Sequence, residues 1–385
     1  MEQFKLFNGL FNWIDRASQQ KFYALALTIF LTLSSLFFAF PRYDQYQETA
    51  ANWEVVMLKS GDLSNDLSHI DPNSWLAKKV FRLTVPLFIK IFHLNRPAVI
   101  IVQFLIGLLF LYFTYIFSKR ILKDAVAATL FTAALVFLYI GRTCFTEITA
   151  TWFDGWAYFF LLMALMLPNA VAVFFFAVLA AWVDERAIVI LPALILFHQM
   201  KNLPSGNTVK ELMHFIVLNK KSIAVVAAFV LTMASRMALT AYAGMKTPLD
   251  NVSLNTVKDN MFVSGFGIFT FFEGLWLLLP VVLLLAFKNK NYVLIALILV
   301  QIAISTAGAI FVYDVTRSGS YMFPLLFVWL TIIAVNMQLT AIRHLLLAAF
   351  FFCLVFPPVN FVSQWNLDYA TEKPMLFVLF KLFAG

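Results

Sequence analysis

Long apolar runs dominate this sequence and constrain its fold more than any other feature. They recur along almost the whole chain, and short segments between them hold most of the charged residues. A helix needs about 20 apolar residues to cross a bilayer, and in lipid only helices and closed barrels satisfy every backbone hydrogen-bonding group. We therefore predict an all-α, polytopic membrane protein with about 11 transmembrane helices. The predicted spans are 22–40, 97–117, 125–141, 152–168, 169–183, 187–199, 222–243, 263–287, 291–311, 321–338 and 341–357.

The composition supports this fold class. Of the 385 residues, 62% are hydrophobic and only 12% are charged, whereas soluble domains carry about a quarter charged residues. The mean hydropathy is +0.85. The net charge of +8 does not indicate nucleic acid as a partner, because no basic block interleaved with aromatic residues lies outside the apolar runs. The 5 histidines are scattered along the chain, so we expect neither a metal site nor a cofactor.

Basic residues set the predicted orientation. The short segments 118–123, 201–221 and 288–290 are rich in lysine and arginine, and such loops stay on the cytoplasmic side. The chain then begins in the cytoplasm, and an odd number of spans places its C-terminus outside. We expect a single membrane domain, 1–385, with an N-terminal interfacial helix at 1–21, a long first extracytoplasmic loop with interfacial helices at 41–96, and an extracytoplasmic C-terminal tail at 360–385.

Three consecutive charged residues interrupt the apolar stretch "AAWVDERAIVILPA". Charge is costly in a bilayer, so Asp184, Glu185 and Arg186 need a local explanation. In one interpretation they form an interfacial turn, in which the aspartate and the arginine pair and cap the start of a helix. In the other they line an outward-facing cavity, in which Arg186 faces an anion. The sequence leaves both interpretations open.

Other predicted extracytoplasmic segments repeat this pattern of acids and isolated arginines. Asp314 and Arg317 are one helical turn apart, and Glu147 and Asp154 lie at the end of another span. Arginine is the preferred phosphate partner because its planar group donates two parallel hydrogen bonds. The pattern therefore favours a phosphorylated ligand, and a lipid phosphate in particular, because its tail can stay in the bilayer.

The first extracytoplasmic loop holds weaker candidates. Arg82 and His69 lie in a stretch that alternates basic and apolar residues, which is typical of interfacial helices. We interpret Lys78, Lys79 and Lys90 as anchors that hold such a helix to lipid headgroups.

Three features of the sequence carry a resemblance to a known family. The stretch "FPRYDQYQETAANWE" places Asp44 just after the first predicted span, "TEITATWFDGW" adds acids to a second extracytoplasmic segment, and "DER" and "DVTR" place charges at later span ends. In this layout the chain resembles the GT-C superfamily of integral membrane glycosyltransferases, which use polyprenyl-phosphate-linked sugars as donors. It has no WWDYG-type sequence, and it has no soluble C-terminal domain like that of many relatives. These departures favour a small or lipid-linked acceptor, or a partner protein.

The resemblance implies an inverting sugar transfer at a bacterial inner membrane, with the active site facing the periplasm. A single carboxylate, here Asp44, takes the proton from the acceptor hydroxyl, while cations hold the departing phosphate. Arg42 keeps this carboxylate ionised. The implied partners are the polyprenyl-phosphate-linked donor, an acceptor glycan or lipid, the bilayer and, as an option, a further protein. The candidate substrate-binding residues are Arg42, His69, Arg82, Glu147, Asp154, Asp184, Glu185, Arg186, Asp314 and Arg317.

Other functions stay open on sequence grounds. A transporter or flippase for lipid-linked substrates would use the same kind of cavity, but the chain shows no internal repeat of the sort that many transporters have. A polysaccharide polymerase or ligase shares the lipid-linked substrates and the arginines. In a non-catalytic scaffold of a larger membrane complex, the charged groups would be structural pairs.

Overall fold

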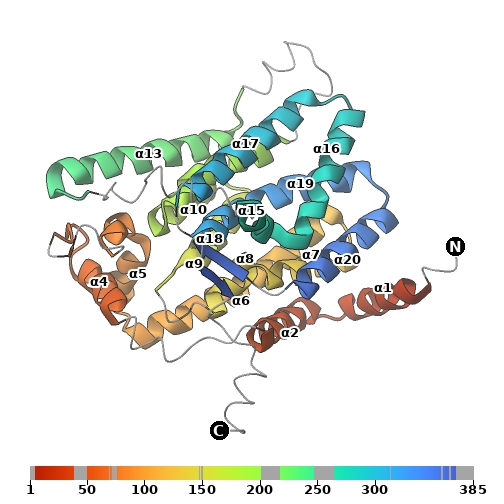
Figure 1. Cartoon of the computed structure of the whole chain (residues 1–385), viewed down its shortest axis with the longest axis horizontal. Coiled ribbons are helices and arrows are strands. Elements are labelled where there is room, and N and C mark those ends of the chain that lie inside the picture. Colours follow the sequence, from red (N-terminus) through yellow and green to blue (C-terminus); the bar gives the residue numbers. More distant parts are fainter. Residues whose placement is uncertain are drawn as a thin grey trace, which may run out of the picture.

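The fold is a bundle of apolar helices with one short antiparallel hairpin (Figure 1). The computed structural model describes residues 5–38, 50–68, 70–71, 76–146, 148, 151–200, 217–246, 264–312, 314–356, 359–363 and 366–369. The first helices are α1 (Lys5–Ser18), α2 (Tyr23–Phe38), α4 (Ala50–Gly61), η2 (Ala77–Phe81), α5 (Thr84–Phe92), α6 (Arg96–Leu122), α7 (Ala125–Phe137), α8 (Tyr139–Thr146), α9 (Asp154–Met166) and α10 (Ala170–Val183). The later elements are α11 (Arg186–Gln199), α13 (Lys220–Ala243), α15 (Ser264–Phe272), η4 (Glu273–Leu277), α16 (Leu278–Lys288), α17 (Tyr292–Ile310), α18 (Val315–Ser320), α19 (Pro324–Asn336), α20 (Leu339–Val355), β1 (Val359–Ser363) and β2 (Asn366–Tyr369).

Each of the predicted apolar runs contains a helix, but the helices differ in length. Among the described residues, 4 helices are long and apolar enough to cross a membrane, or up to 5 if α7 and α8, bent by 58°, form one span. The other apolar helices have 10–17 residues. The helical class is therefore confirmed and is compatible with a multi-pass membrane protein, while the count of eleven spans stays a prediction. The four helices that meet this criterion are Arg96–Leu122, Lys220–Ala243, Gly265–Lys288, which comprises most of α15 with η4 and α16, and Tyr292–Ile310.

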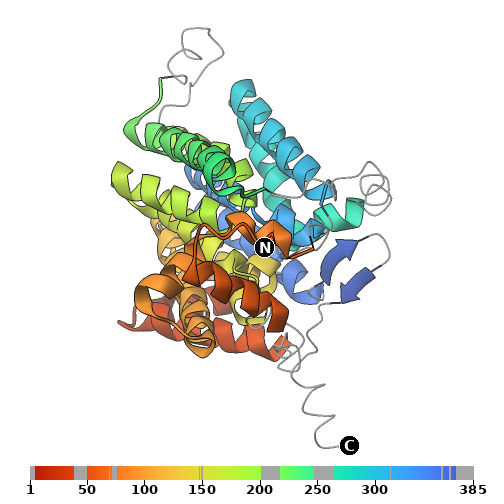
Figure 2. The same cartoon turned by 90° about the vertical axis from the view of Figure 1, so that its left-hand side faces the viewer.

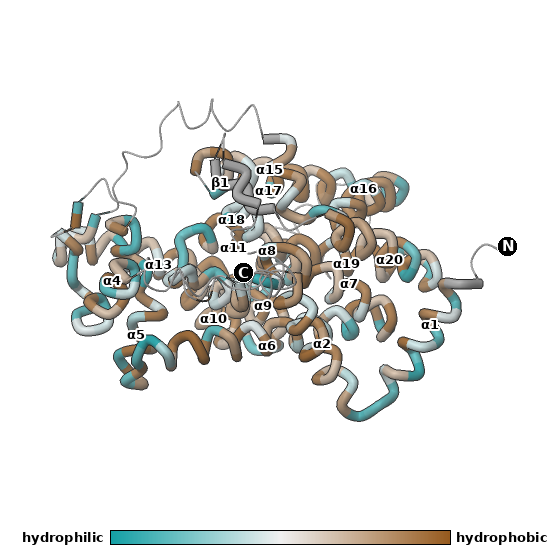
Figure 3. Tube along the Cα trace, turned by 60° about the horizontal axis from the view of Figure 1, so that its bottom comes forward, coloured by the Kyte–Doolittle hydropathy of each residue, from teal (hydrophilic) through white to brown (hydrophobic). Residues whose placement is uncertain are grey.

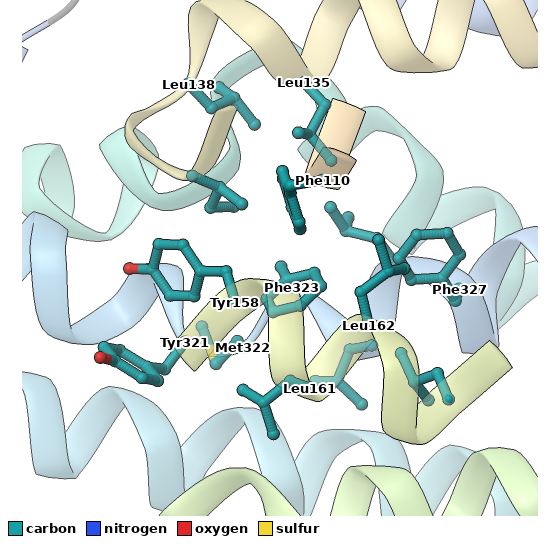
Figure 4. Packing of buried hydrophobic residues seen from close by; sticks show 14 of the residues in the cluster. Phe110, Leu135, Leu138, Tyr158, Leu161, Leu162, Tyr321, Met322, Phe323 and Phe327 are labelled. Atoms are coloured by element: carbon teal, nitrogen blue, oxygen red, sulfur yellow. The ribbon is translucent and has the colours of Figure 1, made fainter. Parts of the chain in front are cut away.

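The centre of the bundle is formed by α7, α9 and α19, whose side chains are buried on nearly all sides. A helix that is apolar all round is stable only where neighbours surround it. Figure 4 shows how rings and aliphatic side chains interlock there: Phe323 faces Phe110, with ring centroids 5.8 Å apart, and Phe327 lies beside them. Aromatic pairs in such edge-on contact add to the free energy of burial.

Glycines allow the central helices to approach closely. A Cβ atom at Gly107 of α6 would lie 2.6 Å from the Cβ of Cys144 on α8, and one at Gly155 of α9 would lie 1.9 Å from the sulfur of the same cysteine. Small residues let helix backbones come together in this way. The start of α9, which carries Asp154, is thus held tightly against α8.

Both ends of the bundle are hydrophilic, but they carry different groups of charged residues. Hydrophilic residues gather around α4 and along α1, which lie at opposite ends of the molecule, and apolar residues cover the helices between them (Figure 3). Near α1, Asp124 accepts a hydrogen bond of 2.7 Å from the backbone of Ala127 at the start of α7, and it pairs through both oxygens with Arg343 of α20. Near α4 lies a larger group of charges, described below.

The hairpin of β1 and β2 lies beside α18 and α15 (Figure 2). It pairs Val359 with Tyr369 and Phe361 with Leu367. This hairpin begins the region that we predicted to be a C-terminal tail, and it is a small departure from an all-helical fold.

Candidate functional site

Seven charged side chains from distant parts of the sequence meet at the α4 end of the bundle. They come from the segment after η2, the start of α9, the turn between α10 and α11, and α18 with its preceding residue. We call this group the charge cluster. Its members are Arg82, Asp154, Asp184, Glu185, Arg186, Asp314 and Arg317.

Asp184 and Arg186 form a two-bond ion pair within the α10–α11 turn. The Nε and Nη2 atoms of Arg186 donate to the two carboxylate oxygens over 2.7 and 2.8 Å. The backbone N–H of Arg186, the first residue of α11, also donates to Asp184, over 3.1 Å. The carboxylate therefore satisfies an otherwise unpaired helix N-terminus and compensates the arginine at once.

Asp154 is bound on both of its oxygens. Arg317 donates through Nε to one oxygen over 2.7 Å, and the hydroxyl of Tyr321 donates to the other over 2.8 Å. Arg186 approaches the same carboxylate, with a nitrogen 3.6 Å from it. The side chain of Asp154 is fully buried, so these contacts stabilise a charge that could not otherwise stay away from water.

Further contacts join these pairs into one network. Arg82 lies 3.0 Å from Asp184 and 3.3 Å from Glu185, and Arg317 lies 3.2 Å from Asp314. Each buried carboxylate therefore contacts more than one cation, and the network fixes the relative positions of α9, α11 and α18.

Aromatic rings cover the arginines where carboxylates do not. The guanidinium of Arg317 lies 4.7 Å from the ring centre of Trp152, and that of Arg186 lies 5.3 Å from the ring centre of Tyr321. Such cation–π contacts favour arginine over lysine because the planar group stacks on the ring. Tyr321 also packs edge-on against Tyr158, 4.9 Å between ring centres, which continues into the apolar core (Figure 4).

The electrostatic surroundings keep Asp184 ionised. Burial opposes its ionisation, but Arg186, Arg82 and Arg317 together outweigh this effect and hold the pKa of Asp184 well below its usual range. Arg82 shows the reciprocal behaviour: burial favours its neutral form, but Asp184 and Glu185 raise its pKa. Since a strong acid is a weak base, Asp184 is poorly suited to remove a proton from a substrate.

Two pockets flank the charge cluster. The loop pocket lies beneath α4 and η2 and offers about 410 Å³ of space free of protein atoms, part of which is open to solvent. Its polar lining consists of Lys59, Lys79, Arg82, Thr151, Asp154 and Asp184, and its other walls are mostly valine. The helix pocket lies between α11, α17 and α18 and offers about 320 Å³ of space free of protein atoms, part of which is open to solvent. Its polar lining consists of Arg186, Ser305, Ser318 and Tyr321.

The structure brings together seven of the residues that the sequence singled out. The local pairing of Asp184 with Arg186 is confirmed, and Arg186 also lines a pocket. That this pocket faces outward and receives an anion stays a prediction. The proposed base Asp44, together with Arg42, His69 and Glu147, lies outside the described residues.

Our interpretation of Lys79 as a lipid anchor is wrong. Its side chain is only 5% exposed, and its Nζ donates to the hydroxyl of Thr151 over 2.7 Å. A buried ammonium group cannot contact lipid headgroups. The sequence reasoning also missed Tyr321, although it follows Arg317 by one helical turn, a spacing that places two side chains on the same helix face.

No cluster of three or more His, Cys, Asp and Glu side chains arranged to hold a metal ion occurs in the described part of the chain. A comparison of the chain with family models, with curated proteins and with solved structures found no match.

Proposed function

We propose that the protein is a membrane glycosyltransferase that moves a sugar from a polyprenyl-phosphate-linked donor to an acceptor at the extracytoplasmic face, with inversion. The observation that carries the proposal is the helix pocket. In it a single arginine, Arg186, lies between two apolar helices at the level of a buried charge cluster. A lipid phosphate has the same division into an anionic head and an apolar tail.

The surroundings of the helix pocket suit such a ligand. Val189 of α11 is an exposed apolar side chain in the pocket lining, and the exposed Ile304 of α17 directly precedes the lining residue Ser305. Within the pocket, Arg186 donates through Nη1 to Ser318 over 3.2 Å. A phosphate oxygen could replace the serine hydroxyl as the acceptor of this bond, since charge-assisted hydrogen bonds are the stronger ones.

The cluster would serve the reaction as a fixed electrostatic frame. Arg186 is oriented by Asp184 and Asp154, so little reorganisation is needed when negative charge develops on a departing phosphate. Because both carboxylates are already held by arginines, the proton of the acceptor must go to another group. Asp44 is the residue that we propose for this role, and a periplasm-facing bacterial inner-membrane protein is the setting that we propose for it.

Binding of the leaving group tests the proposal without knowledge of the sugar. The purified protein in lipid nanodiscs is titrated with a short-chain polyprenyl phosphate and with the matching polyprenol, which lacks the phosphate. We expect the phosphate to bind at least about tenfold more tightly, because a charge-assisted contact contributes roughly 1.5–3 kcal/mol. Equal binding of the two lipids would rule the site out.

A matched pair of variants locates the contact. Arg186→Gln should abolish the preference for the phosphate, because it removes the guanidinium from the helix pocket. Arg343→Gln breaks the comparable arginine–aspartate pair with Asp124 at the other end of the bundle. It should lower thermal stability in a similar way and leave the phosphate preference unchanged. A loss of preference in both variants would point to general unfolding and not to a phosphate contact.

A further inference from the structure

The loop pocket is chemically unlike the helix pocket. Three of its lining side chains are cations, Lys59, Lys79 and Arg82, against two carboxylates. Both carboxylates are already compensated by Arg186 and Arg317, neither of which lines this pocket. Arg82 is also paired with Asp184 and Glu185, so the excess of positive charge in the loop pocket comes from Lys59 and Lys79.

Arg82 has hydrogen-bonding capacity left. One terminal nitrogen holds Asp184 and Glu185, whereas its Nε is buried and has no hydrogen-bond partner among the described residues. A buried donor without a partner destabilises the fold, because it has lost its hydrogen bonds to water. An anion in the loop pocket would offset this destabilisation.

The two lysines add to the same field. Lys59 is 1% exposed, and its Nζ donates to the backbone carbonyls of Leu63 and Asn65 over 2.7 Å each, which uses two of its three hydrogens. Lys79 lies nearby. Burial lowers the pKa of its ammonium group, and the positive charges of Arg82 and Arg317 lower it further. Burial and the neighbouring arginines both disfavour the charged form of Lys79, and a bound anion would favour it.

We infer that the loop pocket binds the acceptor, and that the acceptor is a hydroxyl compound bearing a phosphate or carboxylate group recognised by Arg82 and Lys79. This inference rests on the proposed transferase function for the identity of the ligand as acceptor. The pocket lies under α4 and η2, in the segment that we predict to be the first extracytoplasmic loop, so it suits a ligand that arrives from the water side of the membrane.

In the proposed transfer step, one bond to the anomeric carbon forms as another breaks. The acceptor oxygen forms a bond to the anomeric carbon of the donor sugar, and the bond from that carbon to the phosphate oxygen breaks. The phosphate leaves with the electron pair, and the hydroxyl proton goes to the carboxylate base. The anionic group of the acceptor takes no part in bond making and serves only for recognition.

Three soluble ligands test the inference on the full-length protein in nanodiscs. Equilibrium dialysis compares glucose 6-phosphate, glucuronate and glucose, which share a sugar ring and differ in charge. We expect at least one of the two anions to bind at least about tenfold more tightly than glucose, and the comparison between them separates phosphate from carboxylate recognition. Equal binding of all three would overturn the inference.

Neighbouring lysines provide the matched variants. Lys79→Gln should reduce anion binding at least about tenfold, and Lys79→Arg should restore part of it. Lys78→Gln, which changes an adjacent lysine that is not part of the pocket lining, should leave anion binding unchanged. Equal losses in Lys78→Gln and Lys79→Gln would show that the pocket does not recognise the anion.

The polyprenyl phosphate titration separates this inference from the proposed function. If the lipid phosphate binds and the soluble anions do not, the inference about the acceptor fails alone. If the soluble anions bind and the lipid phosphate does not, the proposed transferase function fails, and with it the identification of the ligand as an acceptor. If the lipid phosphate displaces glucose 6-phosphate, and if the lipid phosphate no longer binds to Lys79→Gln, the loop pocket holds the donor. The inference is then overturned.

Discussion

Asp154 illustrates how the site uses its carboxylates. One of its oxygens accepts from Arg317 and the other from Tyr321, and the side chain is buried. A general base needs a carboxylate lone pair within reach of the substrate proton. Asp154 is therefore better suited to orienting Arg317 than to accepting a proton, which leaves Asp44 as the proposed base.

The role of Asp44 can be measured directly. Asp44→Asn keeps the shape of the side chain and removes its basicity, so we expect sugar transfer to fall by about 10²–10⁴-fold with unchanged binding of polyprenyl phosphate. Transfer and binding are measured on protein of matched expression. Wild-type transfer by Asp44→Asn, together with a folded but inactive Asp154→Asn, would assign the base to Asp154.

Asp154 itself should matter for stability. Asp154→Asn leaves the buried Arg317 without its closest counter-charge, which costs about 3–5 kcal/mol when one partner of a buried pair is removed. Adding Arg317→Gln removes the unpaired charge and should recover part of the loss. Thermal unfolding of both variants in detergent checks this coupling, and strictly additive losses would show that the two residues do not stabilise each other.

The lowered pKa of Asp184 means that the protein should lose stability as the pH falls. Its pKa is lowered in the folded protein, so the unfolded chain binds the proton more readily. The stabilisation is fully present above the unfolded pKa of about 3.9 and is lost as the pH falls below it. Melting temperatures between pH 7 and pH 3 should thus fall less steeply for Asp184→Asn than for wild type. Glu54→Gln, at an exposed position of α4, serves as control and should keep the wild-type slope.

The short helix α18 carries part of the charge cluster, and its position depends on close contacts with α15. α18 has only 6 residues, yet it carries Arg317. It is held by a hydrogen bond of 2.6 Å between the hydroxyls of Thr316 and Thr270, and by Gly319, where a Cβ would lie 2.1 Å from the ring of Phe271. An isolated helix of this length is not stable in water, so tertiary contacts alone place it.

The close contact between α8 and α9 can be tested by filling the space at Gly155. Gly155→Ala would place a methyl group 1.9 Å from the Cys144 sulfur, and such overpacking typically costs about 1–3 kcal/mol. Cys144→Ala removes the sulfur, so the double variant should regain most of the lost melting temperature and should restore the position of Asp154. If Gly155→Ala melts like wild type, the two helices can separate, and the tight packing that we describe does not constrain the site.

At the scale of the whole molecule, the predicted orientation places α4 and the charge cluster outside the cell. Ser64, in the segment after α4, and Lys290, between α16 and α17, are both exposed, whereas the native cysteines Cys144 and Cys353 are buried. A membrane-impermeant thiol reagent applied to intact cells should therefore label Ser64→Cys and not Lys290→Cys. Labelling of Lys290→Cys alone would reverse the topology and move the site to the cytoplasm.

The sequence allowed the helical class and the local pairing to be predicted, because both depend on neighbouring residues. Apolar runs predicted where helices lie, and the "DER" triplet offered the pairing of Asp184 with Arg186 as one of two interpretations. The partner of Asp154 could not be predicted in this way, since Arg317 is 163 positions further along the chain. The burial of Lys79 also depends on how η2 packs against Thr151, which a basic-apolar pattern does not reveal.

The separation between Asp154 and Arg317 also affects how the protein is made. Arg186 leaves the ribosome two residues after Asp184, so this pair can neutralise itself during membrane insertion. Asp154 is synthesised long before Arg317, its closest partner. A nascent chain that ends before α18 thus leaves Asp154 with only its longer contact to Arg186, and the two closest partners of this buried acid, Arg317 and Tyr321, arrive with the later segment.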